Sequence, residues 1–354
     1  MEREIIHVKT GREYDIIVEN GLLKDSGILV GNVSKTKNAA IITDTNVAPL
    51  YLDAVSKSLE SAGFCVKVHI FPAGETSKNH KTLLSIYEFL AQNGFTRSDI
   101  IIALGGGVVG DVAGFAAATF MRGMDFVQIP TTLLAQVDSS IGGKTAVDLC
   151  EGKNLVGAFW QPKLVICDPD TLKTLSPRIF SDGMAEAIKH TLIKDNGLYE
   201  KLLSGAPVDA EFICRNIDIK RRVVERDERE SGERMMLNFG HTLGHAIEKV
   251  YNYEKYTHGE AVAIGMVLIT RFAEKNGLTP DGTADKISLL LEKNGLPSSC
   301  PAPLSDIIKA AHSDKKRSGG GITLVLLHDI GDGFLHRLTD DEFNRFFQME
   351  ASEK

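Results

Sequence analysis

Residues 100–111 read IIIALGGGVVGD, and this short stretch decides the class of fold. Its first five residues are all apolar, which is typical of a strand buried on both faces. The glycines from Gly105 to Gly110 satisfy G-x-G-x-x-G, and a helix-compatible stretch follows at 112–120. Glycines let the backbone turn tightly and approach a pyrophosphate, whose charge then lies at the helix N-terminus. The order of strand, glycine loop and helix therefore predicts a nucleotide-binding unit.

Similar apolar runs flank this unit and alternate with amphipathic stretches. We expect further strands at 39–43, 66–71, 126–129 and 164–167, and helices up to residue 61 and over 78–93. Strands separated by single helices are joined by right-handed crossovers into a mainly parallel sheet. The first half is therefore predicted to be a Rossmann-like, doubly wound α/β domain.

The pattern changes after Pro177, where strand signals become rare. Helical periodicity occurs at 184–194, 210–228, 242–251, 261–276 and 284–293, and only 322–327 looks extended. The sequence thus predicts an α/β domain over residues 1–177 and a mostly α-helical domain over 178–354.

Composition excludes several classes of protein. The 354 residues carry 40 Lys and Arg against 47 Asp and Glu, a net charge of -7, which argues against a nucleic-acid binder. The five cysteines are scattered without a C-x-x-C pair and indicate reduced thiols. The N-terminus lacks the apolar run of a signal peptide, and the most apolar stretches are about half the length of a membrane span. We expect a cytoplasmic protein with no membrane partner.

The glycine loop departs from the usual dinucleotide pattern in one respect. No acidic residue ends a strand about twenty positions downstream, where the ribose-binding acid usually lies. The candidate at a strand end is Asp44, which lies upstream. A tight turn without a ligand is the alternative interpretation.

A second group of chemically informative residues lies in the helical half. Residues 238–248 read NFGHTLGHAIE and place His241 and His245 on one helical face. His258 opens the next predicted helix, and Glu186 lies on an earlier one. Two histidines and a carboxylate with an open position form a catalytic zinc arrangement, although Thr242 excludes the metalloprotease H-E-x-x-H motif. Structural histidines are the alternative, and the spacing leaves open whether His241 or His245 is a ligand.

Several cations have no obvious structural reason. Lys144 and the pair Lys153-Asn154 lie in what we expect to be glycine-rich loops. Residues 220–234 form a dense segment of mixed charge, and 314–317 read DKKR. Each of these alone is more typical of a solvated surface than of a site.

Taken together, the motifs resemble those of the 3-dehydroquinate synthase family. The matching segments, in the family's order, are AGETSK at 73–78, the glycine loop ending at Asp111, PTTLLAQVD at 130–138, GGK at 142–144, DGMAE at 182–186, the two-histidine segment, and HGE at 258–260. Each is modest alone, but the set is specific. The termini and residues 277–303 match little.

The resemblance implies two cofactors. NAD would bind the first domain, and a catalytic zinc, replaceable by cobalt, would be held by Glu186, His241 and His258. The residues expected at NAD are Asp44, Glu75, Lys78, Gly107, Val108, Val109, Gly110, Asp111, Thr131, Thr132, Lys144, Lys153, Thr171, Leu172, Lys173 and Thr174.

It also implies a set of catalytic and substrate-binding residues. His245 would face the substrate and handle protons, and Arg122 would reach the substrate phosphate from the partner subunit of a homodimer. The remaining members are Asp138, Lys144, Asn154, Lys189, Lys220, Glu230, Arg234, Asn238 and Lys316, the last preferred over Lys315.

The implied activity is that of a lyase of the shikimate pathway, which leads to chorismate and the aromatic amino acids. A sugar phosphate, 3-deoxy-D-arabino-heptulosonate 7-phosphate, would become 3-dehydroquinate and phosphate through transient oxidation by NAD, phosphate elimination, reduction and intramolecular aldol closure. A phosphate-bearing substrate needs several fixed cations, which gives the unexplained lysines and Arg234 a purpose. The alternatives are a metal- and NAD-dependent polyol dehydrogenase, a sister sugar-phosphate cyclase, and a non-catalytic NAD-sensing protein.

Overall fold

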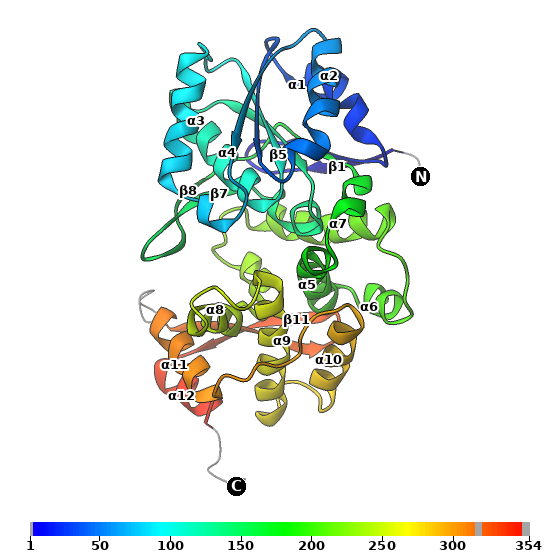
Figure 1. Ribbon diagram of the computed structural model, residues 1–354. Coiled ribbons are helices and arrows are strands. Elements are labelled where there is room, and N and C mark those ends of the chain that lie inside the picture. Colours follow the sequence, from blue (N-terminus) through cyan, green and yellow to red (C-terminus); the bar gives the residue numbers. More distant parts are fainter. Residues whose placement is uncertain (1–2, 316–320, 349–354) are drawn as a thin grey trace. The chain divides into compact units, whose positions relative to one another are not determined.

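The computed structural model describes residues 3–315 and 321–348, and the chain divides into two compact units (Figure 1). The first unit comprises Met1–Ser176 and Val208–Arg229, and the second Pro177–Pro207 and Glu230–Lys354. The segment 208–229 thus belongs to the first unit, whereas the single boundary expected from the sequence places it in the second domain.

A seven-stranded sheet forms the framework of the first unit. The strands, in spatial order, are β1 (Glu4–Val8), β2 (Tyr14–Val18), β9 (Leu164–Cys167), β6 (Asp125–Pro130), β5 (Ile100–Gly105), β3 (Asn38–Asp44) and β4 (Cys65–Phe71). Only the β1–β2 pair at one edge is antiparallel. All five expected strands are confirmed, and β1 and β2 are additional.

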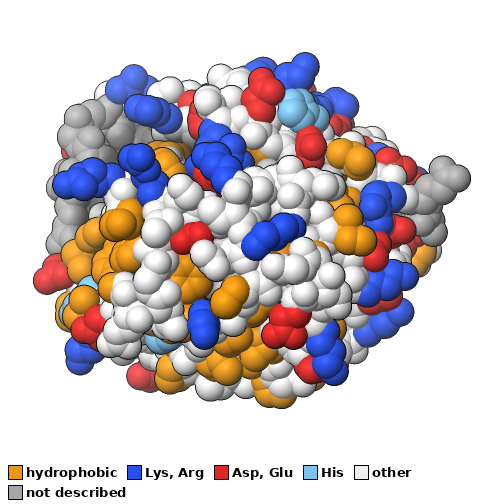
Figure 2. Space-filling model, turned by 90° about the horizontal axis from the view of Figure 1, so that it is seen from above, with side chains coloured by type: hydrophobic (Ala, Val, Ile, Leu, Met, Phe, Trp, Pro, Cys, Tyr) orange, Lys and Arg blue, Asp and Glu red, His pale blue; other side chains and the backbone are white. Residues whose placement is uncertain are grey.

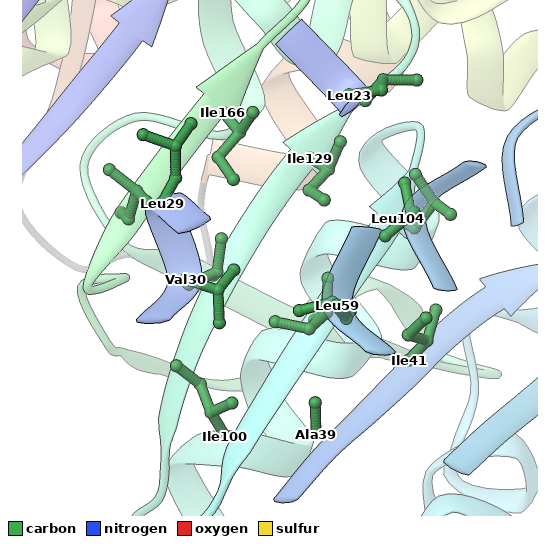
Figure 3. Packing of buried hydrophobic residues seen from close by; sticks show 14 of the residues in the cluster. Leu23, Leu29, Val30, Ala39, Ile41, Leu59, Ile100, Leu104, Ile129 and Ile166 are labelled. Carbon is green, nitrogen blue, oxygen red and sulfur yellow. The ribbon is translucent and has the colours of Figure 1, made fainter. Parts of the chain in front are cut away.

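Helices cover both faces of this sheet, as a doubly wound fold requires. On one face α1 (Ser26–Val33) and α2 (Asp53–Ser61) pack on Ile41 and Ile100, a core shown in Figure 3. On the other, α3 (His80–Gln92) and α4 (Gly107–Thr119) pack on the core that contains Ile42 and Ile101. Successive strand residues point to opposite faces, so every residue of β5 is buried. The short helical turns between these elements are η1 (Leu22–Asp25), η2 (Ala48–Leu52), η3 (Glu75–Ser77), η4 (Phe120–Arg122), η5 (Ala135–Ser139) and η6 (Pro169–Thr174).

Two further elements complete the first unit. Strands β7 (Lys144–Leu149) and β8 (Gly152–Phe159) form an antiparallel hairpin, so the expectation that Lys144, Lys153 and Asn154 lie in loops is wrong. The glycines made these residues resemble a loop in the sequence. Gly157 is needed in the hairpin because a Cβ there would lie 2.1 Å from the Thr145 carbonyl of the paired strand. Helix α7 (Ala210–Arg226) packs on η5 and β1.

The second unit is mostly helical. Its elements are α5 (Pro177–Lys194), α6 (Asn196–Leu203), η7 (Glu233–Asn238), α8 (His241–Val250), α9 (His258–Lys275), α10 (Thr283–Lys293), α11 (Leu304–Lys315), β10 (Ile322–Asp329), β11 (Asp332–Leu338) and α12 (Asp340–Phe346). The helices expected at 184–194, 242–251, 261–276 and 284–293 are confirmed. The expectation that only 322–327 is extended is wrong, because β11 pairs with β10 across a turn at Gly331. Strand β11 reads DGFLHRL and is mostly half-buried, so it lacks the apolar run that revealed β10.

The surface is of mixed charge. On the face shown in Figure 2, basic and acidic side chains are interspersed with hydrophobic ones. Among the described residues, no helix has both the length and the apolar character needed to cross a bilayer.

Candidate metal centre and expected cofactor and anion-binding residues

Most residues expected at NAD follow the carboxyl ends of parallel strands. Asp44 ends β3, Glu75 and Lys78 follow β4, residues 107–111 follow β5, Thr131 and Thr132 follow β6, and residues 171–174 lie in η6 after β9. Because the carboxyl ends of parallel strands share one edge of the sheet, these residues gather where open α/β folds bind ligands. Lys144 and Lys153 lie instead on the β7–β8 hairpin.

The glycine loop brings the start of α4 close to β6. A Cβ on Gly110 would lie 2.6 Å from Oε1 of Gln128, so only glycine permits this approach. The backbone N–H of Thr131 donates to the Gly105 carbonyl at 3.0 Å and joins the ends of β5 and β6. The first turn of α4 contains no acidic side chain. The N–H groups of a helix's first turn have no acceptor within the helix, so this end of α4 suits an anion such as a pyrophosphate.

Two acidic residues of this edge already have partners within the chain. Oδ1 of Asp44 accepts from the N–H groups of Asn46 and Val47. Asp111 forms an ion pair of 2.5 Å with Nζ of Lys78, which is 5% exposed. Burial alone would lower the pKa of Lys78, but Asp111 and Glu75 raise it, so this lysine carries a fixed positive charge.

Gln136 is a buried residue that organises this edge and was not predicted from the sequence. Its amide nitrogen lies within hydrogen-bond distance of the carbonyls of Pro130 and Asp168 and of Oγ1 of Thr171, at 3.0–3.3 Å. Gln136 is fully buried and thereby fixes η6 to the end of β6. It stands in the quoted motif at 130–138, but no spacing rule marks a buried amide as a connector.

Several residues expected at the substrate also belong to the first unit. Lys220 of α7 donates to the Asp138 carbonyl at 2.6 Å, and its Nζ lies 2.8 Å from Oδ1 of the same residue. Asn154 on β8 is exposed, has φ 58°, and donates its N–H to Asp148. Arg122 in η4 has φ 63°, in the left-handed region that non-glycine residues rarely adopt.

The strongest constellation lies in the second unit and consists of Glu186, His241 and His258. Each offers one donor atom, and the three donor atoms lie within 4.8 Å of one another. Nε2 of His241 and Nε2 of His258 each lie 3.4 Å from Oε1 of Glu186. Donor atoms that are each about 2.1 Å from a tetrahedral zinc ion lie about 3.4 Å apart. The donor set and its spacing therefore fit a divalent metal.

The opposite ring nitrogens support the same interpretation. Nδ1 of His241 lies 3.1 Å from the Phe239 carbonyl, which it reaches as a donor when the ring is neutral and Nε2 carries the lone pair. Burial, with the charge of Lys189, lowers the pKa of His241 to about 3, so this ring is neutral. Burial alone would also lower the pKa of His258, but the carboxylates of Glu186 and Glu248 raise it to about 10. The same two negative charges would favour a bound cation beside His258.

His245 lies beside this group but is turned outward. It is exposed, and its ring centroid is 5.4 Å from that of His241 and 6.0 Å from that of His258. Nε2 of His241 lies 3.4 Å from Oε1 of Glu186, which favours His241 as the ligand, and the assignment stays a prediction. A second possible donor group combines His245 and Glu248 with His258.

Cationic and polar side chains accompany the metal group within the second unit. Lys189 forms an ion pair with Glu186, three residues earlier on α5. Lys189 is 2% exposed and Arg234 is 1% exposed. The Asn238 amide donates to Glu230 at 2.8 Å. The expected residue Lys316 lies outside the described residues.

The helices that carry Glu186 and His258, α5 and α9, are joined by hydrogen bonds and an ion pair close to these two residues. The N–H of Gly259 donates to Oδ1 of Asp182 at 2.6 Å. Arg178 of α5 binds both carboxylate oxygens of Glu260 at 2.8 Å. Thr257 and Glu260 form a capping box that begins α9 at His258. None of these fastening roles was predicted from the sequence, because they depend on which helices meet.

Comparisons with known proteins cover most of the chain and agree with one another. The family model described as 3-dehydroquinate synthase N-terminal matches residues 68–182, and the one described as 3-dehydroquinate synthase C-terminal matches residues 183–317. A 3-dehydroquinate synthase of Clostridium acetobutylicum is 46% identical over 95% of this chain and 96% of its own length. One of Streptococcus suis is 49% identical over 95% of this chain and 97% of its own.

Solved structures of more distant proteins share the fold. A 2-deoxy-scyllo-inosose synthase with carbaglucose-6-phosphate, NAD+ and Co2+ has a TM-score of 0.85 at 27% identity, over 97% of this chain and 98% of that one. A 2-epi-5-epi-valiolone synthase from Streptomyces hygroscopicus, with NAD+ and Zn2+, has a TM-score of 0.86 at 26% identity, over 96% and 97%. Two family models that together cover residues 68–317, and relatives nearly half identical over almost the full chain, lead to one conclusion: the chain belongs to the 3-dehydroquinate synthase family.

Proposed function

We propose that this chain is an NAD- and zinc-dependent 3-dehydroquinate synthase. It converts 3-deoxy-D-arabino-heptulosonate 7-phosphate to 3-dehydroquinate and inorganic phosphate, as a carbon–oxygen lyase of the shikimate pathway. The observation that carries the proposal is the metal-donor group of Glu186, His241 and His258 in the same unit as the buried cations Lys189 and Arg234. Lysine and arginine bind phosphate and carboxylate groups through charge-assisted hydrogen bonds, so these two cations suit a substrate that carries both groups.

Both cofactors fit residues of this chain. Glu186, His241 and His258 would hold the metal, since their donor spacing matches tetrahedral coordination. NAD would bind at the carboxyl edge of the sheet, with its pyrophosphate at the start of α4. When bound, the metal supplies a Lewis acid for the substrate hydroxyl and NAD supplies a hydride acceptor that is restored within one turnover.

The other expected residues would bind the substrate or hold the residues that do. Lys144, Lys189, Lys220 and Arg234, with Arg122 from a partner subunit, would bind its anionic groups. A guanidinium binds a phosphate or carboxylate through two parallel hydrogen bonds, which orients the group as well as attracting it. Asn238, held by Glu230, would present its amide to a substrate oxygen. His245, exposed beside the metal group, would move a proton at the substrate hydroxyl through a ring nitrogen.

The decisive experiment follows phosphate release and absorbance of NADH together with the heptulosonate phosphate as substrate. We expect phosphate release that needs both metal and NAD, without net accumulation of NADH. Steady accumulation of NADH, or no phosphate release, would refute the proposal and favour a polyol dehydrogenase.

Arg234→Gln should lower kcat/KM by about 10- to 100-fold, because a charge-assisted bidentate contact is lost. Arg271→Gln is the matched control, since Arg271 is an exposed residue of α9 far along the helix from His258.

A sister sugar-phosphate cyclase is the second candidate. It is favoured by the similarity to 2-deoxy-scyllo-inosose synthase, whose structure contains a phosphorylated carbasugar. Substrate competition separates the two: the proposed enzyme releases phosphate from the heptulosonate and not from glucose 6-phosphate. Faster turnover of the hexose phosphate would reverse the assignment.

We further infer a cytoplasmic homodimer. All five cysteines are free, and Cys65 and Cys150 are exposed, as is typical of a reducing compartment. A dimer would allow Arg122 to serve the partner's site. Light scattering should therefore give about 77 kDa, twice the chain mass of 38.6 kDa. A mass of one chain at assay concentration would contradict this inference.

A further inference from the structure

One buried carboxylate beside the metal group has no role so far. Glu248 of α8 is 3% exposed, and its Oε2 lies 3.7 Å from Nδ1 of His258. It stands seven residues after His241, which is two turns along the same helical face. Helix α8 therefore presents a metal-donor histidine and this carboxylate in the same direction.

The His258 ring lies between two carboxylates. Its Nε2 is 3.4 Å from Glu186, on the side where the ion would be bound, and its Nδ1 faces Glu248. An imidazole that binds a metal through one nitrogen carries a proton on the other, and an oxygen placed there fixes the tautomer and the ring orientation. His241 has such an oxygen in the Phe239 carbonyl. For His258 the corresponding oxygen is Oε2 of Glu248, which faces Nδ1 at an ion-pair distance of 3.7 Å.

Packing does not account for a glutamate at this position. The large apolar residues Leu243 and Ile247 form a different face of α8 from the one that carries His241 and Glu248, so the apolar packing of this helix does not involve position 248. A buried carboxylate is costly unless it is paired. His258 is a partner that a carboxylate at this position can have and an apolar residue cannot.

We propose that Glu248 is a positioning residue that holds His258 with Nε2 directed at the metal and with the proton on Nδ1. It acts through His258 and touches neither metal nor substrate. This inference rests on the proposed function, because it assigns a role toward the proposed metal.

The test measures zinc binding by the full-length protein. The metal-free protein is titrated with zinc in competition with a chromophoric chelator, and the rate of zinc release to excess EDTA is recorded. Glu248→Gln should weaken zinc affinity by about 10- to 100-fold and speed release, as losses of comparable supporting carboxylates do. Glu248→Asp should recover part of the affinity, because it restores the charge on a shorter arm. The visible spectrum of the cobalt-loaded Glu248→Gln protein should differ from wild type, since the orientation of one ligand changes.

Controls separate this role from a purely structural one. Glu254→Gln removes an exposed glutamate just beyond α8 and should leave zinc affinity unchanged. Wild-type affinity and cobalt spectrum in a folded Glu248→Gln protein would overturn the proposal, as would a fall in melting temperature without a change in either. A second zinc equivalent in wild type that Glu248→Gln abolishes would also overturn it, because Glu248 would then be a ligand with His245. If wild type itself binds no zinc, the metal centre of the proposed function fails instead.

Discussion

Among single residues, Glu186 is the one on which the metal group depends most. Its carboxylate is 1% exposed and faces both donor histidines and Lys189. Replacing it removes the anionic member of the group and leaves the positive charge of buried Lys189 beside the two histidines, which disfavours a dication there.

We predict that Glu186→Ala abolishes tight zinc binding and lowers turnover at least about a thousandfold, because the metal supplies several kcal/mol of transition-state stabilisation. Metal analysis of the dialysed protein and a phosphate-release assay measure the two effects. Full activity with bound zinc would disprove that Glu186 is a ligand.

Asp99 is a second residue whose charge has a definite consequence. Its carboxylate accepts from the Thr36 hydroxyl, the Asn38 amide, and both the N–H and the hydroxyl of Thr96, at 2.7–3.1 Å. Burial alone would raise the pKa of Asp99, but these hydrogen bonds lower it. Ionised Asp99 therefore stabilises the first unit at pH values above the pKa of an aspartate in the unfolded chain, about 3.9. This stabilisation is lost as the pH falls through the lower pKa that Asp99 has in the folded state.

We predict that Asp99→Asn costs about 1–3 kcal/mol at pH 7, since an amide meets these donors with an NH2 group. Denaturant unfolding at several pH values should show that the gap in free energy of unfolding between Asp99→Asn and wild type narrows below about pH 4. Asp281→Asn, at an exposed site, is the control. A gap that stays constant down to pH 2 would show that charge is not the cause.

Helices and strands could be predicted where the pattern lies within their own residues, and not where it depends on contacts with other elements. Strand β5 and the glycine loop were readable, because a strand buried on both faces is apolar at every position. The β7–β8 hairpin was not, since its glycines and exposed side chains resemble a loop and its pairing is decided by packing on α4. The expected metal ligands were assigned by resemblance, whereas the contacts of Glu248, Asp182 and Gln136 depend on which elements meet in the fold.

The contact between α5 and α9 gives a prediction of its own. A Cβ on Gly259 would lie 2.2 Å from the Asp182 carbonyl, so the two helices would have to separate next to His258. We predict that Gly259→Ala costs about 1–3 kcal/mol of stability and also weakens zinc binding. Thermal melts and chelator competition measure both.

Gly31→Ala is the matched control for this substitution. Gly31 lies within α1, and its nearest neighbour would be the flexible end of Lys37 at 3.3 Å. That variant should be neutral or up to about 1 kcal/mol more stable, because alanine favours helix. If Gly259→Ala behaves in the same way, the close approach of the two helices does not constrain the metal group.

At the scale of the whole molecule, the chain forms two compact units with separate internal packing, and the proposed cofactors are assigned to different ones. A ligand that binds only the native state stabilises it by about 2.7 kcal/mol at a hundred times its dissociation constant.

We predict that zinc raises the melting temperature of the second unit by about 5–10 °C and that NAD raises that of the first. Calorimetry with each ligand alone, and with chelator, measures the two effects. One transition that moves equally with either ligand would show that the units unfold together.

Helix α7 has a consequence for biosynthesis. It completes the first unit with an apolar face that includes Phe212 and Ile217, yet the ribosome makes it only after α5 and α6 of the other unit. The surface of the first unit that α7 covers therefore stays exposed during synthesis until residue 229 has left the exit tunnel. A recombinant fragment that stops at residue 177 lacks its last piece and the lysine that reaches Asp138.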